Sequence, residues 1–576
     1  MGAIVSSESI DDRKRLLRRL LDDASDYQIN DIPPPGDGAV RSLSAAEISG
    51  QWSQLAEDLR GGALPGHYAN VYLHVPFCRS KCTYCMYDSR LLGDDEIAAG
   101  YAAFIEAQAR YFGAAVDGLS FQNLHVGGGT PTLLDETLLR RMLDAVLGEM
   151  RFAEDASKVV ETNPDNVTPS KAKLLVDCGF NKISMGVQSM DSGVLQRHGR
   201  GHQTRSQVRD ALASLRAAGA PYVNCDFIVG LAGDGARTFL DGLAELFDLG
   251  PDTVMLTKLQ PQWGYLRRHF RGSYTHFADG FDAEYRPIFG SMLELAERAG
   301  YETDNPLESE VGWRFWRRGF RPPYDEQRPY CCTAGAQPSS TLGIGRFARS
   351  NIFGRLVYEQ DGAKVASGAA EARFRGYQSS LGYEAARWTI SQIAARRQLD
   401  RRRFRSLFGA EPEEIFPGVL EALRANGDAK QEDDILRFVA STTRELFILT
   451  RQFLDRRAVL GELANVDRAA VTIDVASTRL RFWVEQVRRR SDYIETAGPI
   501  GLRLEASTSS VKPSSTLVVG VLLQLFRRAL RRRPWASATE VAEWMCARSQ
   551  NLLSDAHDVA VSLERAATTT MSLGSR

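Results

Sequence analysis

One stretch of the sequence determines the predicted fold, Tyr72-Leu73-His74-Val75-Pro76-Phe77-Cys78-Arg79-Ser80-Lys81-Cys82-Thr83-Tyr84-Cys85. The apolar run from Val71 to Val75 predicts a buried parallel strand, and three cysteines follow it. Thiolates separated by three and two residues can hold three irons of a four-iron cluster and leave the fourth iron open. An electron-transfer cluster is normally held by four cysteines, so the open iron indicates a catalytic cluster.

The alternatives for these cysteines are a zinc site and three buried thiols. A zinc ion would need a fourth Cys or His close by, and no fourth cysteine follows within the loop. The position directly after a strand favours the iron–sulfur cluster. The other cysteines are scattered without a disulfide framework, and a reducing cytoplasm fits both them and the cluster thiolates. They are Cys178, Cys225, Cys331, Cys332 and Cys546.

The composition is that of a soluble globular protein with more than one domain. The 576 residues are too many for one ordinary core, and 43% hydrophobic with 25% charged residues is typical of globular chains. The 71 Lys and Arg against 72 Asp and Glu give a net charge of −1, which offers no global argument for nucleic-acid binding. Three arginine runs are interpreted as solvated helix faces, because no aromatic residues are interleaved with them. They are Arg401–Arg403, Arg488–Arg490 and Arg531–Arg533.

Neither a membrane anchor nor a secretory signal is expected. The longest apolar run, Thr516 to Phe526, is interrupted by Gln524 and is too short to span a bilayer. The N-terminus lacks a charged segment followed by a long apolar stretch. We therefore expect a cytoplasmic protein.

From about residue 67 onward, strands and helices alternate along the chain. The predicted strands lie near 69–75, 119–126, 157–162, 181–187, 222–228 and 252–259, and the predicted helices at 95–112, 135–150, 169–177, 203–218 and 236–248. This order predicts an α/β fold with a parallel sheet and outer helices, closed or partly closed as a barrel. In such folds the chemistry lies at the carboxyl ends of the strands.

Glycines and polar residues lie near the ends of the later strands. Gly127-Gly128-Gly129 follows the second strand and would let the backbone approach a ligand closely. Glu161 ends the third strand, Gln188 follows the fourth, and Asp226 lies within the fifth. A single buried polar residue is usually structural, but three of them on one sheet favour convergence on a common site.

Together these residues resemble the radical S-adenosylmethionine (SAM) enzymes, and within them the branch of oxygen-independent coproporphyrinogen III oxidase. The resemblance covers about residues 67 to 260 and continues weakly to about 455. Relatives in this branch include radical SAM methyltransferases, cyclopropanases and haem chaperones. The matching motifs are the cysteine stretch, Gly128-Gly129-Thr130-Pro131-Thr132, Gly186-Val187-Gln188-Ser189, Arg200 with His202, and Asp226-Phe227-Ile228-Val229-Gly230-Leu231.

The resemblance implies a role for each matching residue. Cys78, Cys82 and Cys85 would bind a [4Fe–4S] cluster, and SAM would chelate its open iron. The protein would then position the cofactor and exclude water while a 5′-deoxyadenosyl radical forms. One SAM molecule is implied, and a second can bind beside it in this branch. The expected SAM contacts are Tyr72 and Gly127, Gly128 and Gly129 with Thr130 at the methionine end, Tyr84 at the adenine, Glu161 and Gln188 at the ribose, and Arg200 and Asp226 at the second molecule.

Two departures from the branch bear on the reaction. Coproporphyrinogen oxidases carry a further cysteine two positions beyond the third, where this chain has Tyr87. That departure argues against coproporphyrinogen decarboxylation. The second departure is Cys331-Cys332, which we interpret as two small buried side chains rather than radical quenchers.

The resemblance also divides the chain into four parts. A helical extension at 1–66 would precede the radical SAM core at 67–389, and a helical domain of the coproporphyrinogen oxidase type would follow at 390–456. The last part, 457–576, is predicted to be a small α+β module with strands at 471–475 and 501–505 and helices at 477–488, 516–530 and 537–549.

The leading hypothesis is a radical enzyme that modifies a small molecule, with methyl or methylene transfer from the second SAM. The alternatives are a tetrapyrrole-modifying enzyme, either coproporphyrinogen oxidase-like or haem-degrading, and a haem chaperone with His74 or His202 as a haem ligand. Reduced flavodoxin or ferredoxin would donate electrons, and haem or a porphyrin would be the partner in the alternatives. No nucleic-acid or membrane partner is expected.

Overall fold

The computed structural model describes most of the chain from residue 41 to residue 454 and four strands beyond it. The described residues are 14, 15, 17, 41–62, 68–87, 89–93, 95–261, 263–270, 274–303, 309, 312–322, 339–345, 347–349, 356–360, 374–378, 380–454, 466–475, 478–490, 495–504, 541, 542, 545 and 559–565. They belong to two compact units, one of residues 1–30 and 35–455 and the other of residues 31–34 and 456–576.

The first unit is built on one mixed sheet of 13 strands, with seven parallel strands at its centre. The parallel strands are, in spatial order, β12 (Ser339–Ile344), β2 (Tyr68–Val75), β5 (Ser120–Gly128), β6 (Arg151–Thr162), β7 (Lys182–Gln188), β8 (Val223–Val229) and β9 (Thr253–Lys258). All six predicted strands are confirmed. The sequence did not predict β12, which pairs with β2 from far along the chain.

Antiparallel strands extend the sheet on both sides, so it does not close into a barrel. On the β12 side they are β13 (Phe347–Arg349), β14 (Leu356–Gln360), β15 (Phe374–Gln378) and β1 (Arg41–Leu43), and on the β9 side β11 (Gly312–Arg317) and β10 (Tyr301–Glu302). The partly closed α/β form of the prediction is therefore confirmed, and the closed form is wrong, because β1 and β10 are free edges of the sheet.

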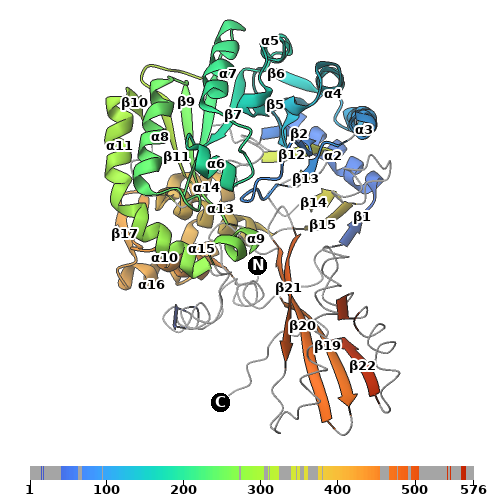
Figure 1. Cartoon of the computed structure of the whole chain (residues 1–576), viewed down its shortest axis with the longest axis vertical. Helices are drawn as coiled ribbons and strands as arrows, with labels where there is room; N and C mark the ends of the chain where they lie inside the picture. The colour runs from blue at the N-terminus through green and yellow to red at the C-terminus, as the bar shows by residue number, and fades with distance from the viewer. Residues whose placement is uncertain are drawn as a thin grey trace. The chain divides into compact units, whose positions relative to one another are not determined.

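Five helices between the parallel strands form an outer layer over the sheet (Figure 1). Side chains cap three of them at their first turns, since Asp135, Thr168 and Thr204 each accept a backbone N–H three residues on. Their apolar stripes are buried against the strands, and all five were predicted. They are α3 (Asp95–Ala115), α4 (Glu136–Glu149), α5 (Pro169–Asp177), α7 (Arg205–Ala217) and α8 (Ala236–Asp248).

Shorter elements shape the loops around the sheet. They are β3 (Phe77–Cys78) with its parallel partner β4 (Arg90–Leu91), η1 (Pro131–Leu133), η2 (Pro164–Asn166), α6 (Ser192–Arg197), α9 (Trp263–His269), α10 (Tyr274–Glu284), η3 (Arg286–Ile288) and α11 (Phe289–Arg298).

The segment before the core is not purely helical. Ser44 caps α2 (Ala45–Arg60) through a capping box with Glu47. Trp52 of this helix is fully buried, with its ring centroid 6.4 Å from that of Phe121 on β5. Before the helix, however, β1 joins the edge of the main sheet, so this segment is part of the core fold.

The segment at 381–453 combines helices with a small antiparallel sheet of order β16-β18-β17. Leu436 and Phe438 lie on β18, where they alternate with Arg437 across a half-buried strand, so this segment is not purely helical. The elements are α13 (Leu381–Arg396), β16 (Gln398–Asp400), α14 (Arg401–Phe408), α15 (Pro412–Ile415), α16 (Val419–Ala425), β17 (Ala429–Glu432), β18 (Ile435–Phe438), α17 (Thr443–Thr450) and η4 (Arg451–Phe453).

Local carboxylates neutralise the arginine run at the start of α14. Arg401 pairs with Glu413 at 2.6 Å and with Glu411 at 3.1 Å, and Arg402 pairs with Asp434. This run is therefore a surface helix face, as the sequence indicated.

The second unit contains an antiparallel sheet of order β21-β20-β19-β22. The strands are β19 (Val466–Val475), β20 (Thr478–Arg490), β21 (Glu495–Leu504) and β22 (Val559–Arg565). The strands predicted at 471–475 and 501–505 fall within β19 and β21. The helix predicted at 477–488 is wrong, since Leu480, Phe482 and Val484 alternate with polar or aromatic residues in the period of a strand. The helix predicted at 516–530 lies outside the described residues.

Across the described ranges, no helix has the length and apolar character needed to cross a bilayer.

Candidate cluster and cofactor site

The cysteine loop leaves the carboxyl end of β2 and is held in place by a segment more than a hundred residues later. The Ser80 hydroxyl donates to the carbonyl of Gly199 at 2.6 Å, and the backbone N–H of Thr83 donates to the carbonyl of His198 at 3.3 Å. Gly199 has φ +78° and approaches the Lys81 backbone so closely that a Cβ would lie 3.0 Å from its carbonyl oxygen. The loop therefore has a fixed support.

His198 links this loop to the end of β8. Its Nε2 donates to the carbonyl of Ala232 at 3.0 Å, so Nδ1 can accept the Thr83 hydroxyl at 2.7 Å. Burial lowers the pKa of His198 to about 4, which keeps the ring neutral at pH 7. The ring stacks on Tyr265 with centroids 5.5 Å apart.

All three thiols of the loop are half-buried. Burial raises the pKa of Cys78 and raises that of Cys85 to about 11. Among the described side chains, no three of His, Cys, Asp or Glu converge as they would around a single metal ion.

The glycine run lies directly beside the cysteine strand. The N–H of Gly129 donates to the Val75 carbonyl at 2.8 Å and that of Thr130 to the Phe77 carbonyl at 2.7 Å. The Thr130 hydroxyl lies 4.0 Å from the Cys78 sulfur. The run and the first cysteine are thus parts of one surface.

No side chain fits at any of the three glycines. A Cβ at Gly127 would lie 2.6 Å from the Glu161 carboxylate, and one at Gly129 would lie 2.5 Å from the Phe77 carbonyl oxygen. A Cβ at Gly128 would collide with the His74 ring, and Gly128 has φ +112°, which other residues rarely adopt. The run therefore forms a narrow backbone cradle.

A polar chain runs around this cradle. The Tyr72 hydroxyl lies 3.0 Å from His74 Nδ1, and the Tyr72 and His125 ring centroids are 5.7 Å apart. His125 Nε2 lies 2.8 Å from Glu161 Oε1, while Glu161 Oε2 accepts the N–H of Gly128 at 3.3 Å. These two contacts orient both carboxylate oxygens of Glu161, the residue predicted to bind the ribose. His125 was not predicted, because it lies inside an apolar strand pattern.

Gln188 is held in a strained conformation at the end of β7. It has φ +67°, and the pairing of β7 with β8 shifts by one residue between Gly186 and Gln188. Its amide approaches Gly186 so closely that a Cβ there would lie 2.6 Å from Nε2. Such strain is typical of positions that aim a side chain at a functional site.

Asp226 lies half-buried on β8. It accepts hydrogen bonds from the Ser184 hydroxyl and the Asn224 amide, both at 2.8 Å. Burial raises its pKa to about 6, and the charge of Glu161 adds to this shift. The two predicted carboxylates are therefore close enough to influence each other.

Arg200 and Tyr84 meet near the second cysteine. Arg200 is buried, with Nη1 at 3.9 Å from the Cys82 sulfur. Burial raises the pKa of Tyr84 well above its ordinary value, and its ring lies edge-on to His198 with centroids 5.9 Å apart. Asn163 and Gln203 bind Arg200 and were not predicted, since only the fold brings them together.

Of the two departures from the branch, the structure describes only Tyr87. Tyr87, at the position of the additional cysteine, is 48% exposed. Cys331 and Cys332 lie outside the described residues, so their interpretation stays a prediction.

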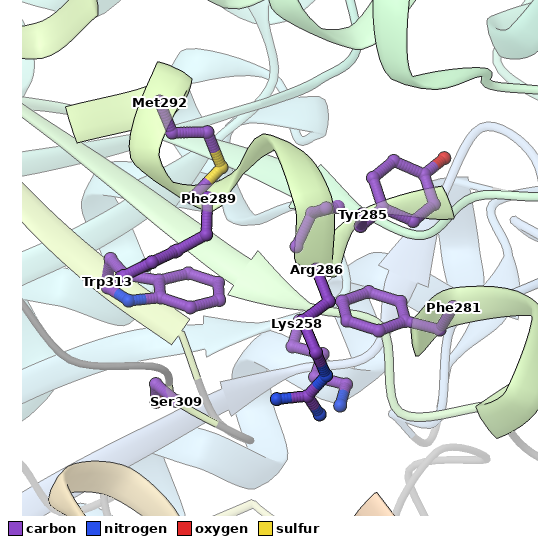
Figure 2. A pocket seen from close by; sticks show the side chains of 9 residues that line it. Lys258, Phe281, Tyr285, Arg286, Phe289, Met292, Ser309 and Trp313 are labelled. Carbon is purple, nitrogen blue, oxygen red and sulfur yellow. The ribbon is translucent and has the colours of Figure 1, made fainter. Parts of the chain in front are cut away.

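A separate pocket lies where β8 and β9 end. Figure 2 shows Lys258 beside the Phe281 ring and the Arg286 side chain next to it; the Lys258 nitrogen lies 4.1 Å from the ring centroid. Lys258 donates to the Thr443 hydroxyl at 2.9 Å, and Arg286 pairs with Asp282 at 2.8 Å. Val229, at the end of β8, lines this pocket. Successive side chains of a strand point to opposite faces of the sheet, and Val229 is three positions after Asp226. The pocket therefore lies on the other face of the sheet from Asp226.

Comparisons with known proteins agree with this geometry. Residues 72–246 match the Radical SAM superfamily. An oxygen-independent coproporphyrinogen III oxidase of Paracoccus denitrificans is 32% identical over 196 residues, which are 34% of this chain and 43% of that protein. The heme chaperone HemW of Mycobacterium tuberculosis is 30% identical over 247 residues, 42% of this chain and 63% of that protein. The chain thus matches less than two thirds of the length of either relative.

Two further similarities extend beyond the central strands. HemW of Haemophilus influenzae is 27% identical over 362 residues, 58% of this chain and 89% of that protein. The solved structure of coproporphyrinogen III oxidase (HemN) from Escherichia coli superposes with a TM-score of 0.57 at 19% identity, and covers 75% of this chain and 99% of that one. This last similarity shows the fold alone.

The superfamily implies a [4Fe–4S] cluster and SAM, and the residues present fit both. Three thiols on one loop suit a cluster with an open iron. A Cβ at Gly127, Gly128 or Gly129 would collide with Glu161, His74 or Phe77, so only glycine lets this run pack directly beside the cysteine strand. Residues 72–246 therefore form a radical SAM domain, and the chain's relatives include coproporphyrinogen oxidases and HemW heme chaperones.

Proposed function

We propose that this protein is a radical SAM enzyme that acts on a tetrapyrrole or a related small molecule. One observation carries the proposal: the glycine cradle is hydrogen-bonded alongside the strand that delivers Cys78, with Thr130 touching both. A ligand held on the cradle would thus lie next to the open side of a cluster bound by the three thiols. When bound, the cluster supplies the electron that cleaves SAM.

The chain's own residues would position SAM and shield it. The Gly127–Gly129 backbone would accept its methionine end, and Glu161, oriented by His125 and Gly128, would accept the ribose hydroxyls. Strained Gln188 would bond the ribose from the carboxyl end of β7, the parallel neighbour of β6. Asp226 and Arg200 would meet a second SAM molecule, if one binds.

The substrate class rests on the relatives, whose names refer to coproporphyrinogen III and heme. Tyr87 replaces the additional cysteine of the oxidases, which argues against decarboxylation of coproporphyrinogen itself. Methyl or methylene transfer from a second SAM stays a prediction, because none of the relatives named above is a methyltransferase.

The test is anaerobic reconstitution of the full chain with iron and sulfide, followed by dithionite and SAM. We expect 5′-deoxyadenosine from the wild-type protein and none from Cys82→Ser. Cys178→Ser, which alters a half-buried thiol directly after α5, should keep the activity. Absence of 5′-deoxyadenosine from a protein that holds four irons would overturn the proposal. S-adenosylhomocysteine among the products would identify methyl transfer.

A heme chaperone is the second candidate, because the relative with 89% of its own length matched is a HemW chaperone. The chaperone hypothesis predicts a Soret band on haem addition and transfer of that haem to an apoprotein without 5′-deoxyadenosine formation. A haem spectrum that His74→Ala and His202→Ala both leave unchanged would remove these two histidines as ligands.

A further inference from the structure

Arg200 carries a positive charge in a buried position. Arg200 is only 5% exposed and lies in the segment that follows α6. Nη2 donates to the carbonyl of Gly186 at 2.6 Å, to Gln203 Oε1 at 2.7 Å and to Asn163 Oδ1 at 3.0 Å, and Nε donates to Gln203 at 3.2 Å. Every one of these acceptors is a neutral carbonyl or amide oxygen.

No carboxylate compensates this charge within the described part of the chain, since no Asp or Glu forms an ion pair with Arg200 there. Burying a cation without an anion is costly, and proteins normally avoid it by pairing. Neutral acceptors orient the guanidinium but do not cancel its charge. A counter-charge must therefore come from another group.

One further donor of the guanidinium, on the side that also faces Tyr84, contacts such a group. Nη1 of Arg200 lies 3.9 Å from the sulfur of Cys82, within the range of an N–H···S hydrogen bond. Gln203 is itself fixed, because its amide donates to the Val187 carbonyl at 2.7 Å. The guanidinium is thus fixed in position: Nε and Nη2 donate to carbonyl and amide oxygens, and Nη1 faces Cys82, a predicted cluster ligand.

We infer that Arg200 is the counter-charge of the cluster and makes it easier to reduce, through a hydrogen bond to the Cys82 thiolate. This inference rests on the proposed function, because it requires a cluster on Cys78, Cys82 and Cys85. Reduction adds one electron to the cluster and involves no proton or leaving group. A fixed positive charge and a hydrogen bond to a ligand sulfur both favour the more negative state, and both are known to set the potentials of such clusters.

The test is an anaerobic redox titration of the reconstituted full chain with dithionite, followed by electron paramagnetic resonance in the absence of SAM. We expect Arg200→Gln to lower the equilibrium constant for reduction about tenfold, which is about 59 mV for a one-electron couple. Arg200→Lys keeps the charge and should recover part of this loss. Arg205→Gln, which removes an arginine that is 58% exposed and paired with Glu245, should leave the midpoint unchanged.

A wild-type midpoint in an Arg200→Gln protein with full iron content overturns the inference. If the same variant also binds SAM more weakly, Arg200 is assigned to SAM instead. If the wild-type chain binds no cluster, the proposed function itself fails. If the enzyme is active but Arg200→Gln leaves the reduction midpoint unchanged, only this inference fails.

A spectroscopic readout on the unaltered protein covers the case in which Arg200 variants do not fold. Wild-type protein labelled with guanidino-¹⁵N arginine should give a ¹⁵N coupling to the reduced cluster in pulsed electron paramagnetic resonance. Absence of that coupling would equally overturn the inference.

Discussion

At the scale of single residues, a buried carboxyl group makes the stability of the fold depend on pH. Asp234 lies just before α8 and is 5% exposed, and among the described residues neither of its carboxylate oxygens has a hydrogen-bond partner. Burial raises its pKa to about 7, and the charge of Asp191 adds to the shift. The folded protein therefore holds a proton on Asp234 that the unfolded chain releases near pH 4.

The raised pKa of Asp234 leads to a prediction for the stability of the protein. Between about pH 4 and pH 7 the folded state binds more protons at Asp234 than the unfolded state, so its contribution to stability falls as the pH rises. Asp234→Asn removes the ionisable group and should stabilise the protein by roughly 1–3 kcal/mol at pH 8, and by much less at pH 5. Urea denaturation at the two pH values measures the effect. Asp241→Asn, on an exposed aspartate of α8, is the control, and equal stability of wild type and Asp234→Asn at pH 8 would contradict the prediction.

The glycine cradle gives a second prediction. Gly128→Ala would force a Cβ into the His74 ring at a backbone conformation that alanine avoids, so we expect SAM to bind at least about tenfold more weakly. Gly148→Ala, on α4 with open space around its Cα, should bind SAM like the wild type. Equilibrium dialysis with reconstituted protein measures both, and equal affinity in the two variants would count against the cradle.

At the scale of elements, the supports of the cysteine loop lie in another connection, the one between α6 and α7. Thr83→Val keeps the shape of the side chain but removes the hydroxyl that reaches His198. We expect this variant to lose iron to a chelator several-fold faster than the wild type, because a looser loop exposes the thiolates. Thr168→Val, which removes a cap from distant α5, tests whether any loss of a hydroxyl has the same effect. Iron release at the wild-type rate from Thr83→Val would show that the support is dispensable.

The sequence predicted the central strands and helices well, because parallel strands buried on both faces are continuous apolar runs and the helices between them carry clear stripes. It missed β12, whose sequence Ser339-Ser340-Thr341-Leu342-Gly343-Ile344 has no such run and becomes a strand by pairing with β2. It also predicted a helix where β20 alternates in the period of a strand. In these segments long-range pairing outweighs local pattern.

The same distinction holds for the candidate site. The cysteines and glycines were found because their spacing is local. His125, Asn163 and Gln203 were not, because their importance depends on contacts with Glu161 and Arg200 across different strands and loops. A sequence alone also cannot reveal that, among the residues the structure describes, no carboxylate pairs with Arg200.

At the scale of the whole molecule, we expect cluster assembly and SAM binding to depend on the first unit alone. All predicted cluster and SAM residues belong to the first unit, which ends at Asp455. A chain truncated after Asp455 should therefore still assemble the cluster and bind SAM with an affinity within about threefold of the wild type, since none of the predicted ligands is removed. Iron content and equilibrium dialysis measure this, with Cys82→Ser in the truncated chain as the negative control. Loss of the cluster on truncation would assign the second unit to the integrity of the site.

The pairing of β2 with β12 has a consequence for biosynthesis. The strand that delivers the cysteines has β5 on one side and β12 on the other, and β12 begins only at Ser339. The contacts of the cysteine loop with His198 and Gly199 also come from later in the chain. During translation the three thiols therefore leave the ribosome long before their surroundings exist. We therefore expect iron insertion to follow synthesis of the chain at least through β12, and until then the nascent thiols depend on the reducing power of the cell.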